Sequence, residues 1–280
     1  MLIVTGTKRS GTSMWMQILT SAGFPAFGEA FPRNWGETLK DANPDGFYES
    51  ILRQGIYYRT NPHPRSGAYF FPEQVERHVV KVFIPGLVRT DRAYIGSVVA
   101  TVRHWREYHD SLERLYAMED EAREDRKGND ERPPRIPPVF EWWAENFSLI
   151  RDIVTRRYRV HVQSYDGLLA DPKTVIENTL DWVGDKDIDV AAAVAAVKPK
   201  NRTQTRNDDA PAPEGLDTQA TDAFELLYRT VHERSGLDPA LIAKLNEVHV
   251  KLAPRINAAQ KAVADARKAR RRRPNPETTP

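Results

Sequence analysis

The residues best suited to chemistry lie close to the N-terminus, in a short loop between two apolar segments. An apolar strand pattern, Met1–Thr5, leads into the loop Gly6–Gly11, and an apolar helix pattern follows at residues 14–19. Free backbone N–H groups and the helix dipole make such a helix start a binding place for phosphate or sulfate. The loop and helix start also offer hydroxyl and basic groups, at Lys8, Arg9, Ser10, Thr12 and Ser13.

The two glycines of this loop have the spacing of the phosphate loop G-x-x-x-x-G-K-[ST]. Thr12 stands where that pattern has its lysine, and the basic residues Lys8 and Arg9 lie inside the loop instead. The group that binds the β- and γ-phosphates of a nucleoside triphosphate is therefore missing. We predict a different phosphorylated or sulfated ligand, and the competing interpretation is an ordinary strand–turn–helix with solvated basic residues.

Composition limits the class of protein. The chain has 280 residues, 40% of them hydrophobic, and this suits one α/β domain with embellishments. A net charge of +2 gives no reason to expect a nucleic-acid partner. The absence of cysteine excludes disulfides and thiolate metal sites, and no apolar run is long enough for a membrane span. With no signal-peptide pattern, we expect a cytoplasmic protein.

Four β-branched runs predict buried parallel strands alternating with helices. The predicted strands are residues 2–5, 78–84, 97–102 and 158–163. Residues 1–216 should form the core. Within it, residues 24–75 are rich in Pro, Gly and aromatic side chains and predict an irregular insertion on the substrate side, and charged, Pro-rich residues 119–138 predict an exposed loop.

The rest of the chain predicts helices. Helical patterns cover residues 139–156, 172–182 and 187–197, and two longer ones cover 217–235 and 239–268. We expect the last two to form a hairpin packed on the core or across a homodimer. Residues 269–280 are strongly basic and predict a disordered, solvated tail, and contact with an anionic surface is the alternative.

The loop resembles that of a known enzyme family. Lys8–Ser13 (Lys-Arg-Ser-Gly-Thr-Ser) is similar to the sequence P-[KR]-[ST]-G-T-[ST], which binds the 5′-phosphosulfate in sulfotransferases that use PAPS, 3′-phosphoadenosine 5′-phosphosulfate. Lys8 replaces the proline, and Arg9 falls on the family's catalytic lysine or arginine. The resemblance implies a P-loop-type central parallel sheet flanked by helices, PAPS as co-substrate, PAP (adenosine 3′,5′-bisphosphate) as product, and no required metal.

Two further segments resemble the nucleotide-binding parts of this family. Arg103 ends a predicted strand and Ser111 follows eight residues later, as do the arginine and serine that hold the 3′-phosphate. A guanidinium fork and a hydroxyl suit phosphate oxygens, although pairing of Arg103 with Asp110 or Glu107 is the alternative. Tyr165 begins a stretch that resembles Y-E-D-L-x-x-D-P, whose tyrosine lines the nucleotide pocket. Residues 198–206 could add cations, but no single residue can be assigned.

Two residues complete the predicted catalytic set. Lys81, in the segment Lys-Val-Phe, resembles the lysine of the family's K-T-H sequence, and Phe83 stands where the histidine base would be. Glu49 offers a replacement base, because residues 43–49 resemble the N-P-x-G-[FY]-[FY]-E stretch of bacterial sulfotransferase-like chains. The alternative for Glu49 is a surface glutamate paired with Arg53, and for Lys81 it is the amphipathic end of a strand.

The resemblance therefore implies a sulfotransferase. It would move the sulfuryl group from PAPS to a hydroxyl or amine of a small-molecule or glycan acceptor, with Arg9, Lys81 and Glu49 as catalytic residues. Two other functions stay open. One is a small-molecule or nucleotide kinase, for which Asp166 is the best magnesium candidate, and the other is a non-catalytic protein of the same fold that binds PAP or another anion.

Overall fold

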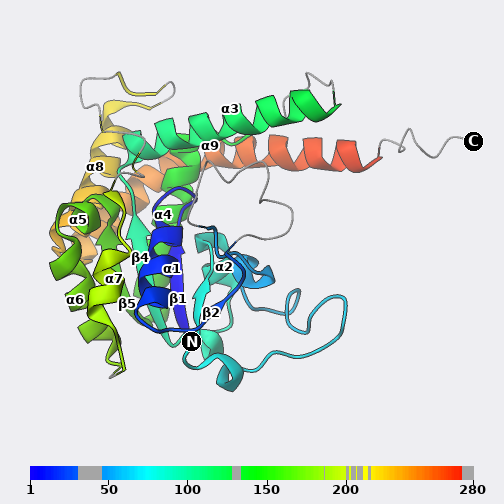
Figure 1. The fold of residues 1–280 in the computed structure, drawn as a ribbon. Helices are drawn as coiled ribbons and strands as arrows, with labels where there is room; N and C mark the ends of the chain where they lie inside the picture. The colour runs from blue at the N-terminus through cyan, green and yellow to red at the C-terminus, as the bar shows by residue number, and fades with distance from the viewer. Residues whose placement is uncertain are drawn as a thin grey trace, which may run out of the picture.

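The fold is an α/β arrangement around a parallel sheet (Figure 1). The computed structural model describes residues 1–30, 46–127, 134–185, 187–199, 202, 206, 211–213 and 216–272. Five strands, all parallel, lie in the order β2-β3-β1-β4-β5. Their bounds are Leu2–Gly6 (β1), Ala26–Phe27 (β2), Val79–Lys81 (β3), Ser97–Val102 (β4) and Arg159–Ser164 (β5).

Helices cover both faces of this sheet. The α-helices are Thr12–Ser21 (α1), Ile84–Arg89 (α2), Trp105–Lys127 (α3), Pro138–Arg156 (α4), Tyr165–Ala170 (α5), Pro172–Val183 (α6), Val190–Ala195 (α7), Thr218–Glu233 (α8) and Pro239–Arg272 (α9). Short 3-10 helices occupy Ile51–Gln54, Pro72–Val75 and Arg92–Tyr94. The α/β class and the parallel sheet predicted from the sequence are confirmed.

Alternation along the strands decides which helices lie on which face. In β1, Leu2 and Val4 pack with α1, α6 and α7, and Ile3 packs with α2 and α4 on the other side. All three side chains are at most 5% exposed, because a parallel sheet is covered on both faces. This burial on both faces explains the continuous apolar run that the sequence shows there.

The two central strands send their connections in opposite directions. β1 lies between β3 and β4, with Leu2 in register with Val79 and with Ser97. The chain leaves β1 through α1 toward β2, and it leaves β4 through α3 and α4 toward β5. The carboxyl ends of β1 and β4 therefore flank a topological switch point, which is where open α/β sheets form ligand-binding crevices.

A second apolar cluster joins the C-terminal helices to the core. Phe224 of α8 is fully buried and stacks on Trp143 of α4, with ring centroids 4.8 Å apart. Trp142 and Trp105 contact the same phenyl ring at 5.2 and 5.9 Å. Residues of α9 such as Leu245 and Leu252 belong to the same cluster. In Figure 1, α9 extends past the sheet on the same side of the molecule as α3.

The structure differs from the sequence prediction in several boundaries. β3 covers only Val79–Lys81 of the predicted strand 78–84, because α2 starts at Ile84 with a proline in its first turn. β2 is a two-residue edge strand that the local sequence pattern does not predict. Residues 31–45 of the predicted insertion lie outside the described residues.

The predicted exposed loop 119–138 is partly wrong. α3 continues to Lys127, and Arg135 binds Asp120 through both of its Nη atoms, at 2.7 and 2.8 Å. This ion pair, with Asp120 buried, replaces the expected solvated charges. The predicted tail also begins later than expected, because α9 reaches Arg272, and residues 273–280 lie outside the described residues.

No helix among the described residues is long and apolar enough to cross a membrane.

We predict that Phe224→Ala lowers the free energy of unfolding by about 3–5 kcal/mol, because it removes the ring that three tryptophans contact. Chemical denaturation of the purified protein measures this change. Tyr58→Ala is the control, because Tyr58 is 76% exposed and its loss should cost less than about 0.5 kcal/mol. Equal effects of the two substitutions would contradict the assignment of Phe224 to the centre of this cluster.

Candidate functional site

The loop between β1 and α1 is fixed by hydrogen bonds to itself and to β4. The Ser10 hydroxyl donates to the Thr7 carbonyl at 2.7 Å, and the Thr101 hydroxyl donates to the Ser10 carbonyl at 2.8 Å. A Cβ at Gly6 would lie 2.4 Å from Ser10 Oγ and 2.6 Å from the Thr101 carbonyl oxygen. Only glycine fits at this position, so the loop lies directly against β4.

The start of α1 leaves its first turn open to a ligand. Gly11 has φ of +93°, no side chain caps the helix, and its first turn holds no acidic residue. A Cβ at Gly11 would lie 2.6 Å from the Tyr165 ring. This bare backbone and the helix dipole together favour an anion here.

Two guanidinium groups lie beside this helix start. Arg9 donates from Nε to Ser111 Oγ at 3.1 Å, and Arg103 donates from Nη1 to the Arg9 carbonyl at 3.1 Å. The guanidinium carbon of Arg103 also lies 5.0 Å from the centre of the Tyr165 ring. Burial, followed by the positive charge of Arg103, lowers the pKa of Arg9. An anion between the two arginines would relieve this repulsion.

A buried carboxylate partly compensates these charges. Glu107 is fully buried and accepts from Arg103 Nε at 3.2 Å, as one of the sequence alternatives proposed. Glu107 also pairs with Arg202, whose guanidinium group binds Asp166 at 2.8 Å. The Tyr228 hydroxyl donates to Asp166 in turn. The segment 198–206 thus contributes Arg202 to the site, a residue that the sequence could not single out.

A second group of polar residues surrounds Lys81. Its ammonium group, with the side chain only 3% exposed, donates to the Phe47 carbonyl at 2.7 Å and to Ser13 Oγ at 3.1 Å. One carboxylate oxygen of Glu49 lies 3.6 Å from Lys81 Nζ, and the other pairs with Arg53. Glu49 is buried rather than on the surface, although its predicted pairing with Arg53 is present. Residues 43–45 of its motif lie outside the described residues.

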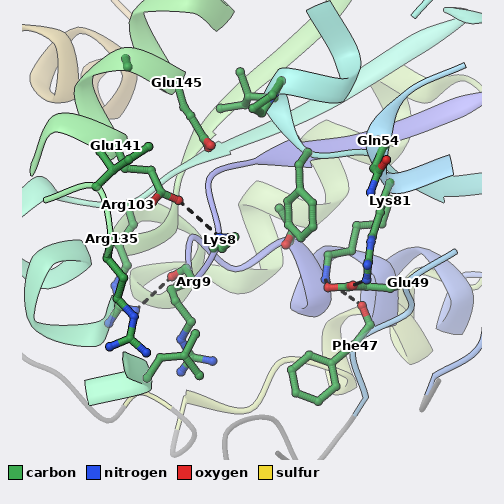
Figure 2. A pocket seen from close by; sticks show the side chains of 18 of the residues that line it. Lys8, Arg9, Phe47, Glu49, Gln54, Lys81, Arg103, Arg135, Glu141 and Glu145 are labelled. Atoms are coloured by element: carbon green, nitrogen blue, oxygen red, sulfur yellow. Dashed lines mark hydrogen bonds and ion pairs between the residues drawn. The ribbon is translucent and has the colours of Figure 1, made fainter. Parts of the chain in front are cut away.

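One cavity joins these groups. Its volume is about 1320 Å³, which exceeds the roughly 300–1,000 Å³ of a typical single-ligand pocket. Figure 2 shows Lys81 and Glu49 on one side, Lys8 and Arg9 in the middle, and Glu141 and Glu145 on the opposite side. Of the predicted site residues, those that line it are Lys8, Arg9, Gly11, Thr12, Ser13, Glu49, Lys81, Arg103 and Tyr165.

Two predicted binding residues do not line this cavity. Ser10 is fully buried and its hydroxyl bonds within the loop, and Ser111 is buried behind Arg9. Both residues hold the loop and its arginine in position. Direct contact of either hydroxyl with a phosphate stays a prediction.

Sequence reasoning missed the opposite wall of the cavity. Glu141 and Glu145 of α4 and Arg135 line it, together with the end of α9 from Gln260 to Arg267. Spacing of four residues places the two glutamates on one helix face. The spacing of this pair can be read from the sequence. The two glutamates lie, however, within a tryptophan-rich helix, whose apolar pattern predicts a packing role and gives no sign of a cavity.

Comparison with protein-family models gave no match, and a search of curated proteins gave none either. The family resemblance therefore rests on the sequence motifs alone. Among the described residues, no cluster of three or more His, Asp or Glu side chains is placed to hold a metal ion.

The ammonium group of Lys81 gives a testable pH dependence. Burial lowers its pKa from 10.5 to about 8, and the nearby Glu49 opposes this shift. Between pH 8 and 10.5 the unfolded chain therefore holds this proton more tightly, and the stability of the fold rises with pH. Relative to Lys81→Met, we expect the free energy of unfolding of the wild type to rise by up to about 3 kcal/mol across this interval.

Chemical denaturation of both proteins at several pH values measures this difference, and other titrating groups cancel between them. Parallel stability curves would show that Lys81 keeps an ordinary pKa in the folded protein.

Proposed function

We propose that this chain is a P-loop-type sulfotransferase that binds PAPS and transfers its sulfuryl group to an acceptor. The observation that carries the proposal is the meeting of Arg9 and Arg103 beside the uncapped start of α1. Two guanidinium groups and bare backbone amides at a switch point suit a ligand with two separate anionic groups. PAPS has such groups in its 5′-phosphosulfate and its 3′-phosphate.

The residues fit this ligand in type and in position. The bare backbone at Gly11 and the cations Lys8 and Arg9 would hold the 5′-phosphosulfate. Glycine is needed at this position, because a Cβ at Gly11 would fill the space against Tyr165. Arg103 and Arg202 would hold the 3′-phosphate, which would take the place of Glu107 as their anionic partner. Tyr165 would lie along the nucleotide.

Lys81 and Glu49 would act on the transferred group. PAPS supplies an activated sulfuryl group, whose sulfur–oxygen bond to the phosphate breaks as the acceptor oxygen or nitrogen bonds to sulfur. Arg9 and Lys81 would stabilise the negative charge that develops on the leaving and peripheral oxygens. Glu49 would accept the acceptor's proton, and Lys81 Nζ at 3.6 Å would help to orient its carboxylate.

The kinase alternative has weaker support. Its candidate magnesium ligand, Asp166, is held by Arg202 and by the Tyr228 hydroxyl. The non-catalytic alternative shares the nucleotide site and differs only in turnover, so binding is the first property to test.

We predict that PAP raises the melting temperature more than AMP, ADP or ATP, with or without Mg²⁺, because only PAP carries a 3′-phosphate. At a hundred times its dissociation constant, a ligand adds about 2.7 kcal/mol to the stability of the folded state. Thermal denaturation measures this effect. A response to ATP that requires Mg²⁺, without a response to PAP, would favour the kinase.

Arg103→Ala should abolish most of the PAP response, because it removes the guanidinium group assigned to the 3′-phosphate. Arg77→Ala is the control, since Arg77 precedes β3, at the amino ends of the strands and away from the candidate site, and pairs with Asp185. An unchanged PAP response in Arg103→Ala would contradict this assignment.

We further predict that Gly11→Ala weakens PAP binding at least tenfold, because the new Cβ would clash with the Tyr165 ring and shift the loop. Gly67→Ala is a matched control: Gly67 also has positive φ, of +69°, but a Cβ there would have no atom within 4 Å. Both variants carry the backbone strain of an alanine at positive φ. Calorimetric titration with PAP separates the two, and equal affinities would contradict the loop's role.

A further inference from the structure

The end of the cavity opposite Lys81 contains an unsatisfied carboxyl group. Glu141 is 9% exposed, and its two oxygens lie 3.6 Å from Lys8 Nζ and 3.4 Å from the Tyr116 hydroxyl. Glu145 lies one turn later on α4 and also lines the cavity. Its Oε2 atom is buried and has no hydrogen-bond partner. Buried polar atoms are rarely left unpaired, so this oxygen indicates a missing partner.

The cations around Glu145 do not supply that partner. Lys8 is half exposed and lies next to Glu141. Arg135 binds Asp120 and Glu119 and stacks on the Tyr116 ring at 4.1 Å. Arg267 of α9 also lines the cavity and is exposed, but the Glu145 oxygen remains without a hydrogen bond.

The negative charge of Glu141 acts on Glu145. Burial, followed by this charge, raises the pKa of Glu145 to about 8, and Lys8 opposes this shift. This carboxyl group therefore keeps its proton at neutral pH. An ammonium ion beside it would favour the charged form and displace that proton.

Apolar and polar side chains of the same helices also line the cavity. The apolar ones include Leu115 of α3, Ile136, Ala144 of α4 and Val263 of α9, and the polar ones include Glu119 of α3 and Gln260 of α9. In Figure 2, the Glu145 carboxyl group points into the cavity on the side of Lys8, the first basic residue of the anion-binding loop. A ligand suited to this end would combine a positively charged group with an apolar body long enough to extend toward Lys8 and Arg9.

We propose that this end of the cavity binds an organic ammonium ion, and that Glu145 and Glu141 select acceptors that carry one. As a statement about acceptors, this inference rests on the proposed sulfuryl transfer. A protonated nitrogen has no lone pair to attack sulfur, so the ammonium group anchors the acceptor and a separate hydroxyl group takes the sulfuryl group. The acceptor class is then an amino alcohol with an apolar body.

Calorimetric titration of the full chain, saturated with PAP, tests this site with three matched probes. Benzylammonium, benzyl alcohol and benzoate share one ring and differ in charge. We expect benzylammonium to bind at least about tenfold more tightly than the alcohol, as a hydrogen bond to a charged group predicts, and benzoate to bind more weakly still. Benzyl alcohol that binds as tightly as benzylammonium would overturn the proposal.

Glu145→Gln should lower the benzylammonium affinity about tenfold or more and leave the PAP affinity and the melting temperature near those of the wild type. The amide keeps the shape of the carboxyl group, and the buried oxygen has no hydrogen bond to lose. Glu177→Gln is the matched control, because Glu177 lies on α6, half exposed, and pairs only with Lys173 among the described residues. Unchanged benzylammonium binding in Glu145→Gln would overturn the proposal.

PAP binding is measured on the same samples, so the two proposals fail separately. If PAP does not bind but benzylammonium binds selectively, the sulfotransferase function is overturned and the cation site is supported. PAP binding without a preference for benzylammonium supports the nucleotide site and overturns the ammonium specificity.

Discussion

The proximity of positive charges at the carboxyl ends of β1 and β4 is the constraint on which the site depends. Arg103 donates to the carbonyl of Arg9, so two guanidinium groups share a small, mostly buried space. Such an arrangement is stable only with anionic compensation. The chain supplies part of it through Glu107, and the anion-binding start of α1 offers a place for the rest.

This compensation connects distant parts of the sequence. Arg202 joins Glu107 to Asp166, and Asp166 accepts a hydrogen bond from Tyr228 of α8. Residues of α3, α5, a late loop and the C-terminal helix α8 thus share a single electrostatic network. The C-terminal helices belong to the site for this reason, as well as through the packing of Phe224 on Trp142 and Trp143.

The sequence predicted the elements whose patterns are strong and local. Strands β1 and β4 and helix α4 lie close to their predicted bounds, because uninterrupted β-branched runs and a tryptophan-rich helical period have one natural interpretation. β2 has only two residues and is held by its neighbour β3, so its own sequence carries no strand signal. Asp120 appeared as solvated charge because its partner, Arg135, is remote along the chain.

The site residues also divide into those fixed by the local sequence and those fixed by packing between remote segments. Lys8, Arg9 and Gly11 were predictable because a short loop sets their spacing by itself, and all three line the cavity. The contacts of Lys81 with Phe47 and Ser13 depend on where the irregular segment packs, which no local pattern determines. Glu145 acquires its importance only from the cavity, whose lining brings α4 together with the end of α9.

The hydrogen bond between Tyr228 and Asp166 has a consequence for the motions of the molecule. An anion that attracted Arg202 would change the charge that faces Asp166, and with it the strength of one of the bonds that hold α8. We therefore expect the local opening of α8, which amide hydrogen exchange would measure, to depend on whether the loop Gly6–Gly11 holds an anion. A helix that touches no ligand would in this way report whether the loop is occupied.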